Sequence, residues 1–292
     1  MPDFDMRVVL LGAGGQLAHD LQIELRKFDT HSFARTELDL ADAGALERKL
    51  SEIGPTHVVN AAAYNLVDQA ESEPEAAFAV NAYGVRNLAR ACQKVGARLL
   101  HFSTDYVFGQ QLDRDTPYGE DDLPGPVSVY GLSKLTGEHF VRFHCPQSFV
   151  VRTCGLYGVK GSRGKGGNFV ETMIRLADSG KSLTVVNDQR CTPSFTADVA
   201  RTAVQLLETD AFGVHHIVNS GSCTWYEFAC EIFRQLGKSV DCKPITSAQF
   251  NAKARRPGYS VLGMEKLNAQ RIPPTPEWKE ALGRYLAVRK NS

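Results

Sequence analysis

A tyrosine and a lysine four residues apart are the first feature of this sequence with chemical potential. In the stretch "VYGLSKLTGE", Tyr130 and Lys134 are separated by about one helical turn, so in a helix they share a face. Tyrosine is a poor acid at neutral pH because its ordinary pKa is ~10, but a neighbouring ammonium favours tyrosinate and lowers that pKa. The pair therefore predicts a proton donor; the alternative is an ordinary solvated turn of a surface helix.

Polar side chains end an apolar run shortly before this pair. In "HFSTDYVF" the hydroxyls of Ser103 and Thr104 precede the carboxylate of Asp105. Reduction of a ketone needs a hydride from nicotinamide and a proton on the carbonyl oxygen. We expect Thr104 to hydrogen-bond that oxygen beside Tyr130, and Lys134 to hold the nicotinamide ribose. Ser103 and Asp105 are predicted to face the substrate.

A glycine-rich turn, "LLGAGGQLAHDL", follows the first apolar run and opens the first expected helix. Gly12, Gly14 and Gly15 would let the chain turn tightly and bring backbone N–H groups to an anion at the helix N-terminus. The alternative is a strand–helix turn that binds nothing. Its place as the first turn of a strand–helix repeat favours dinucleotide binding.

The cofactor type is predicted from the end of the second apolar run. The run ends in Ala34 and then Arg35, with no carboxylate at its end, and Arg35 could pair with a 2′-phosphate, which favours NADPH with NADH as the alternative. A solvated loop arginine is the competing interpretation. Asp39 and Leu40 are expected at the adenine end. Three small residues after the third run would allow close approach of a flat cofactor, and they are Ala61, Ala62 and Ala63.

Apolar runs alternate with helical periodicity along most of the chain. This alternation predicts an α/β fold, a Rossmann-type doubly wound parallel sheet. The expected strands are 7–12, 31–34, 57–62, 98–103, 148–153, 183–186 and 214–219. The expected helices are 16–27, 43–53, 74–95, 130–143, 168–179 and 197–207.

The rhythm changes after residue 220, which predicts a smaller C-terminal substrate-binding lobe. Its first helix should begin at Thr224, with Glu227 at capping-box spacing, and a final helix is expected at 277–289. We assign 1–154 with 183–219 to the NAD(P)-binding part. The lobe takes 155–182 with 220–292, including the glycine-rich insertion 158–169.

Bulk composition describes an ordinary soluble protein. The 292 residues carry no net charge, which gives no bias toward nucleic acid or a membrane surface. No apolar run approaches the ~20 residues that span a bilayer. Seven cysteines form no CxxC pair, and we read them as buried thiols in a reducing cytoplasm. No metal site is predicted, and a homodimer is left open.

The ordered motifs of the chain resemble the dTDP-4-dehydrorhamnose reductase family of extended short-chain dehydrogenases/reductases. They include "GAGGQLA", "VVNAAAYNLVDQAE", "FSTDYVF", "VYGLSKLTGE", "GGNFVETMIRLA" and "RRPGYSVL". The resemblance implies NAD(P)H-dependent reduction of dTDP-4-dehydro-L-rhamnose, with Thr104, Tyr130 and Lys134 as catalytic trio. It places Val67 and Asp105 near the sugar. It also implies cofactor contacts from Gly12, Gly15, Gln16, Leu17, Asp39, Leu40, Ala62, Ala63, Tyr64 and Asn81.

Departures from the family pattern concern the sugar pocket. Gly155 stands where the family often has tryptophan, and Gly109 and Gln110 alter the loop after the catalytic strand. Arg256 is a candidate diphosphate contact, with a surface salt bridge as the alternative. Asn168 and Gln189 are candidate hydrogen-bond donors to the substrate.

Two other functions remain open on the same scaffold. A nucleotide-sugar dehydratase or epimerase is one, although dehydratases of this type have a glutamate where this chain has Tyr106. The other is a non-catalytic NADP-binding subunit, resembling the regulatory subunit of methionine adenosyltransferase. A complete Thr104–Tyr130–Lys134 set favours catalysis over that role.

Overall fold

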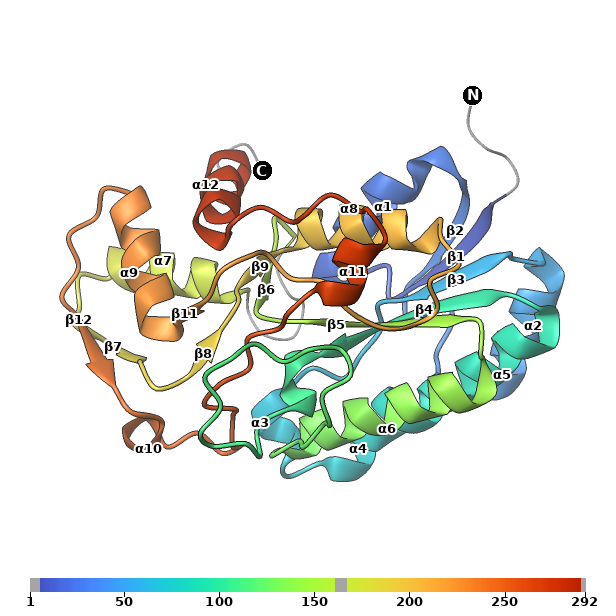
Figure 1. Cartoon of the computed structure of the whole chain (residues 1–292), viewed down its shortest axis with the longest axis horizontal. Helices are drawn as coiled ribbons and strands as arrows, with labels where there is room; N and C mark the ends of the chain where they lie inside the picture. The colour runs from blue at the N-terminus through green and yellow to red at the C-terminus, as the bar shows by residue number, and fades with distance from the viewer. Residues whose placement is uncertain (1–5, 161–166, 290–292) are drawn as a thin grey trace.

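A six-stranded parallel sheet forms the centre of the protein (Figure 1). The structure, a computed structural model, describes residues 6–160 and 167–289. Strand order is β10-β5-β4-β3-β1-β2, and every pairing is parallel, so all carboxyl ends meet at one edge. The strands are β1 (Arg7–Leu11), β2 (Asp29–Phe33), β3 (His57–Asn60), β4 (Arg98–Thr104), β5 (Ser148–Thr153) and β10 (Gly213–His216).

Helices cover both faces of this sheet, which confirms the predicted doubly wound fold. Helices α1 (Gln16–Glu24) and α8 (Thr196–Leu207) pack on one face, in a core with β1 and β5. On the opposite face lie α2 (Ala43–Ile53), α5 (Val85–Val95) and α6 (Val129–His144), as Figure 1 shows. Central strands are buried on both sides, which explains their nearly continuous apolar runs.

Local signals start and stop several helices. The Ser128 hydroxyl accepts from the Gly131 N–H and begins α6 one residue before the expected position. Thr224 and Glu227 form the predicted capping box at the start of α9 (Trp225–Gln235). Gly54 and Gly96 end α2 and α5 in the left-handed conformation.

The helix expected over 74–95 is continuous but not uniform. It consists of α4 (Pro74–Phe78), a π-helical segment (Ala79–Gly84) and α5. The π-helical turn contains Asn81, whose side chain bonds the backbone of Tyr64 and the hydroxyl of Ser133. Such turns commonly place side chains at functional sites.

A second hydrophobic core gathers the C-terminal elements, and we call these elements the lobe. It contains α7 (Phe169–Asp178), α9, α12 (Trp278–Val288), β7 (Leu183–Val186) and β12 (Cys242–Ile245). The assignment of 183–186 to the nucleotide-binding part is wrong, because β7 pairs with β12 and not with the six-stranded sheet. Leu183 and Val185 are apolar enough for the main sheet or for the lobe. In the structure they pack in the lobe core with residues of α9.

Short elements connect the lobe to the main sheet (Figure 1). Two-residue strands pair as β6 (Leu156–Tyr157) with β9 (Ser194–Phe195), and as β8 (Arg190–Cys191) with β11 (Cys223–Thr224). The remaining short helices are α3 (Val67–Ala70), α10 (Ser247–Phe250) and α11 (Glu265–Ala269), with 3-10 turns at Leu25–Lys27 and Asp105–Val107. Residues 161–166 of the expected glycine-rich insertion lie outside the described residues.

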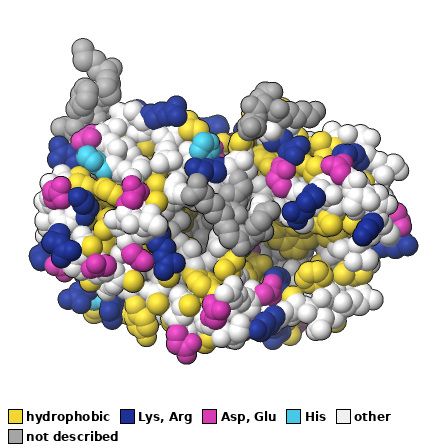
Figure 2. Space-filling view, turned by 180° about the vertical axis from the view of Figure 1, so that it is seen from behind, with side chains coloured by type: hydrophobic (Ala, Val, Ile, Leu, Met, Phe, Trp, Pro, Cys, Tyr) yellow, Lys and Arg dark blue, Asp and Glu magenta, His cyan; other side chains and the backbone are white. Residues whose placement is uncertain are grey.

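The surface matches the neutral composition. On the face in Figure 2, basic and acidic side chains are intermixed, and neither sign forms a continuous field. Within the described ranges, no helix is long and apolar enough to cross a membrane. All seven cysteines are free thiols, and five of them are buried.

Candidate active site

The structure brings Thr104, Tyr130 and Lys134 together at the carboxyl edge of the sheet. Thr104 is the last residue of β4, and its hydroxyl lies near enough to the Tyr130 hydroxyl, in the first turn of α6, to lower the pKa of the tyrosine. Lys134 lies one turn further, 2% exposed, and its Nζ donates to the Phe102 carbonyl at 2.6 Å. Helix α6 packs this close to the chain after β4 only because residue 131 is a glycine. A Cβ at Gly131 would lie 2.2 Å from the Tyr106 carbonyl oxygen.

Burial shifts the acid–base properties of both helix residues. Burial raises the pKa of Tyr130 to about 12, against a lowering contribution from the Thr104 hydrogen bond. Burial lowers the pKa of Lys134 to about 8, while the nearby Glu138 carboxylate raises it. The lysine is thus protonated at neutral pH and sits near the point of losing its charge.

The two other polar residues at the end of β4 point into the protein. Asp105 is 2% exposed, and its carboxylate accepts from Ser260 at 2.6 Å, Cys154 at 3.1 Å and Thr104 at 3.2 Å. Burial raises the pKa of Asp105 to about 6, although these bonds oppose the shift. Ser103 donates to Glu138 Oε1 at 2.5 Å. Both predicted substrate residues are therefore engaged by protein groups here.

The glycine turn has the geometry of a nucleotide cradle. Gly12 adopts φ +83°, and a Cβ there would lie 2.7 Å from the Ala62 nitrogen, so only glycine fits between β1 and the chain after β3. Gly15 precedes α1 without any side-chain cap, which leaves the first N–H groups of the helix, beside Gly14, for a ligand. Leu17 is buried beneath the turn.

The residues expected at the adenine end lie just past β2. Arg35 has a side chain 77% exposed, and its Nε donates to Asp39 Oδ2 at 3.1 Å. Asp39 also accepts from the Ala41 N–H, which lowers its pKa, while Leu40 is buried against Gly84. Glu37, absent from our prediction, accepts from the Ala34 N–H at 2.7 Å.

The chain after β3 supplies an open shelf of small residues. Ala61, Ala62 and Ala63 are partly or fully exposed at the sheet edge. Tyr64 follows, and its backbone is fixed by the amide of Asn81 through bonds of 2.9 Å in both directions. This arrangement joins the shelf to the π-helical turn and, through Ser133, to α6.

The remaining predicted residues hold the lobe and its connections in place. Val67 begins α3, and the adjacent Asp68 pairs with Arg256 at 2.7 Å, so the guanidinium is already paired. Asn168 caps α7 and donates to Gln16 Oε1, the Gly158 carbonyl and Tyr285. Gln16 also donates to the Leu156 carbonyl, and Gln189 donates to Ser247. The first residue of α1 therefore contacts the lobe directly.

Trp225 occupies the space beside Gly155. The indole of Trp225 would lie 3.4 Å from a Cβ at Gly155, and it packs on Phe169 with ring centroids 4.8 Å apart. The partly exposed indole contacts both the lobe core and the cluster containing Cys154. Trp225 therefore borders the position where the family often has its own tryptophan.

Sequence reasoning missed two charged residues beneath the trio. Glu138 and Arg152 form a buried ion pair at 2.8 Å, with side chains 2% and 4% exposed. The signal was present, because an arginine inside the buried strand "SFVVRT" requires a partner. Tyr106 also lies near the site, with its ring edge-on to that of Tyr130 and the ring centroids 5.8 Å apart.

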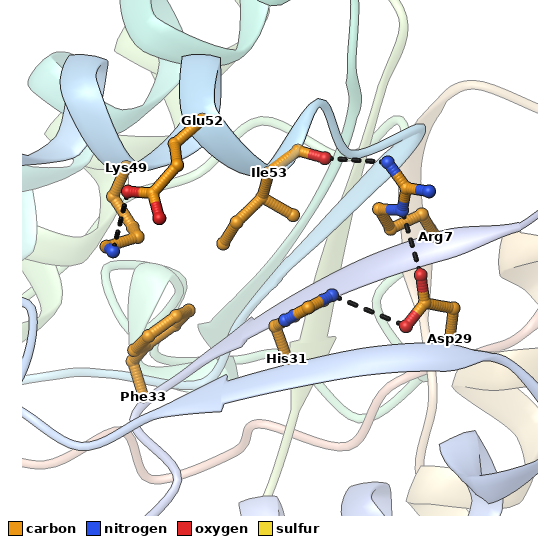
Figure 3. A pocket seen from close by; sticks show the side chains of 7 residues that line it. All are labelled: Arg7, Asp29, His31, Phe33, Lys49, Glu52 and Ile53. Atoms are coloured by element: carbon orange, nitrogen blue, oxygen red, sulfur yellow. Dashed lines mark hydrogen bonds and ion pairs between the residues drawn. The ribbon is translucent and has the colours of Figure 1, made fainter.

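A surface cavity of about 390 Å³ lies away from these residues, between β2 and α2 (Figure 3). Its charged lining is already paired: Arg7 with Asp29, and Lys49 with Glu52. We therefore place the candidate active site at the carboxyl edge and not in this cavity. No cluster able to hold a metal ion occurs within the described ranges.

A doubly wound parallel sheet with a glycine turn after its first strand is the Rossmann-type architecture of dinucleotide-binding proteins. More narrowly, the chain belongs to the family of the RmlD substrate binding domain, whose model matches residues 6–290.

Relatives of named function match nearly the whole chain. The dTDP-4-dehydrorhamnose reductase of Streptomyces griseus is 40% identical, over 94% of this chain and 91% of its own length. The spore coat polysaccharide biosynthesis protein SpsK of Bacillus subtilis (strain 168) is 36% identical, over 98% and 99%. The structure of the Bacillus anthracis str. Ames dTDP-4-dehydrorhamnose reductase in complex with NADP superposes with TM-score 0.91 at 40% identity, covering 97% of this chain and 99% of that one.

Proposed function

We propose that this protein uses NADPH to reduce the C4 ketone of a dTDP-4-dehydro-6-deoxy sugar, with dTDP-4-dehydro-L-rhamnose as substrate and dTDP-L-rhamnose as product. The observation that carries the proposal is that Thr104, Tyr130 and the anchored side chain of Lys134 come together at the carboxyl edge of the sheet. The relatives named dTDP-4-dehydrorhamnose reductase support the choice of sugar.

The trio has distinct roles in this reaction. When bound, NADPH would supply a hydride to C4, so the ketone oxygen would gain negative charge and need a proton. Tyr130 gives that proton from its hydroxyl, and Thr104 holds the oxygen in line through its own hydroxyl. Lys134 stabilises the tyrosinate that remains, because its ammonium lies one turn away in a site with little water.

The glycine turn fits a dinucleotide. Gly12 leaves room where a Cβ would meet Ala62, and the uncapped start of α1 presents N–H groups to a pyrophosphate. Gly14, Gly15, Gln16 and Leu17 complete the turn in our proposal, and the shelf Ala61–Ala63 with Tyr64 and Asn81 would contact the bound cofactor.

NADPH is our choice of cofactor because Arg35 is exposed where a 2′-phosphate would lie, with NADH as the alternative. Arg35→Ala should lower kcat/KM for NADPH by about tenfold and leave that for NADH unchanged. Steady-state kinetics with both cofactors measures this. Equal losses for both would assign Arg35 to the surface ion pair with Asp39.

We propose that the sugar nucleotide binds between the end of β4 and the lobe. We propose that Val67, Asn168 and Arg256 line this space, with Arg256 exchanging Asp68 for a phosphate. Ser103 and Asp105 act through their protein partners, beneath Thr104. A homodimer and a cytoplasmic location stay predictions from sequence.

The competing functions have less support. Elimination of water would need a base where this chain has Tyr106, and burial raises the pKa of that phenol well above its usual range. A purely regulatory subunit does not need Thr104, Tyr130 and Lys134 together at one edge of the sheet.

Turnover by the purified protein tests the proposal. With NADPH and dTDP-4-dehydrorhamnose we expect loss of the nicotinamide absorbance and formation of dTDP-L-rhamnose. A panel of other dTDP-4-keto sugars measures how narrow the pocket is. If NADPH binds but none of these sugars is reduced, the regulatory alternative replaces the enzyme.

A further inference from the structure

A buried carboxylate lies one helical turn beyond Lys134. Glu138 accepts from Arg152 Nε at 3.0 Å and from Arg152 Nη2 at 2.8 Å, so the pair is bidentate. Ser103 donates to the same carboxylate at 2.5 Å. Three elements, α6, β4 and β5, therefore meet at one side chain.

These bonds fix the part of α6 that carries the lysine. Lys134 bonds the carbonyl of Phe102, and Glu138 bonds the hydroxyl of the next residue, Ser103. Two residues one turn apart on the helix are thus tied to consecutive residues of the strand that ends in Thr104. A shift of the helix along the strand would break both bonds together, so its register against Thr104 is set here.

The carboxylate also determines the charge around Lys134. His101, on β4, lies near the ammonium, and burial lowers its pKa well below the usual range, so it is neutral. Arg152 approaches from β5 and is neutralised by Glu138. Tyr130 is uncharged before the reaction. Glu138 is therefore the one negative group facing Lys134 among these neighbours, and its field favours the ammonium form.

We propose that Glu138 is a positioning residue for Lys134, holding its ammonium in place and in the charged form for the cofactor ribose. This rests on the proposed function only through the binding of NADPH. A purely stabilising role explains the pair less well, because burying two charges costs about as much as their attraction returns. Arg152 Nη1 is moreover buried without a hydrogen-bond partner in the part of the chain that the structure describes.

The test follows NADPH binding alone, by the fluorescence of bound NADPH between pH 6 and pH 10. In the unmodified protein, affinity should fall as Lys134 loses its proton. In Glu138→Gln the midpoint of that fall should move about one pH unit lower, because the loss of a neighbouring opposite charge disfavours the ammonium form. The double variant Glu138→Gln with Arg152→Met removes both charges, so no buried arginine is left unpaired. Its pH midpoint should also move lower.

A matched control is a second buried carboxylate distant from Lys134. Asp198 has a side chain 1% exposed and pairs with Arg284 at 2.5 Å. Asp198→Asn should lower the melting temperature and leave the pH midpoint unchanged.

Three results would overturn the proposal: an unchanged midpoint in both Glu138 variants, an equal shift in Asp198→Asn, or failure of both Glu138 variants to fold, which would make the pair purely structural. Because the binding test contains no sugar, its result does not depend on whether the proposed sugar reduction is correct. Absence of turnover with dTDP-4-keto sugars would refute that function and leave this measurement valid, whereas absence of NADPH binding would refute both.

Discussion

Lys134 Nζ donates to the carbonyl oxygen of Phe102 across 2.6 Å. An ammonium has three donors, so this bond anchors the side chain and leaves two donors for ribose hydroxyls. The anchor is a backbone atom of the strand that ends in Thr104, and it therefore fixes the lysine relative to the residue proposed to hold the ketone.

Alkaline pH should inactivate the enzyme through Lys134. Burial lowers the pKa of this lysine to about 8, so kcat/KM should decline as pH rises through about 8. Lys134→Arg should be slower but lack that decline, because a guanidinium stays protonated. Profiles of kcat/KM from pH 6 to pH 10 measure both. The same decline in the arginine variant would assign it to another group.

Substitution of Gly12 should remove cofactor binding. Gly12→Ala would place a methyl group 2.7 Å from the Ala62 nitrogen at φ +83°, and we expect at least a tenfold loss of NADPH affinity by titration. Gly96 is the matched control, since φ is +72° with no atom within 4 Å of its Cβ position. Gly96→Ala should cost about 1–2 kcal/mol of stability and leave NADPH affinity unchanged. Equal affinity in both variants would refute the cradle.

Asp105 should make stability depend on pH in mildly acidic conditions. Its folded pKa of about 6 lies above the unfolded value near 4, so the folded state binds the proton more tightly. The associated stability is present below about pH 4 and is lost as pH rises through 6, by up to ~3 kcal/mol.

Urea unfolding at pH 4, 5, 6 and 7 measures this contribution. Asp105→Asn should show a weaker loss of unfolding free energy over that range than the unmodified chain, because the variant has no proton to release. Parallel pH dependences in the two proteins would show that the carboxyl is not strained by burial.

Trp225 should report on the sugar. The chain has two tryptophans, and Trp278 is 4% exposed in the lobe core, so Trp278→Phe leaves Trp225 as the single indole. Gly155 follows Thr153, the register partner of Thr104, by two residues, which places the indole near the reacting end of the sheet. We expect dTDP-L-rhamnose to change Trp225 emission and dTDP alone to leave it unchanged. Saturating product without any change would place the sugar elsewhere.

Local sequence patterns predicted most elements because their causes are local. The two-sided apolar runs of β3 and β5 and the Thr224 cap of α9 depend on residues within a few positions. The pairing of β7 was not predictable in this way, since Leu183 and Val185 suit any apolar surface. Its partner, β12, lies some sixty residues further along the chain, beyond the reach of a local pattern.

The candidate site was predictable where spacing carries the chemistry, as for Tyr130 and Lys134. Directions of side chains at a strand end were not. Ser103 and Asp105 were expected to face the substrate, yet their oxygens meet Glu138, Ser260 and Cys154. Those partners come from α6, the residue after β5 and the segment after α10, so only the folded chain brings them together.

The central claim is that the Tyr130 hydroxyl supplies the proton, and Tyr130→Phe tests it most directly. With NADPH and dTDP-4-dehydrorhamnose, kcat should fall by about 100- to 10,000-fold while NADPH affinity and melting temperature change little, because only one hydroxyl is removed. Turnover within a few-fold of the unmodified protein would contradict the account.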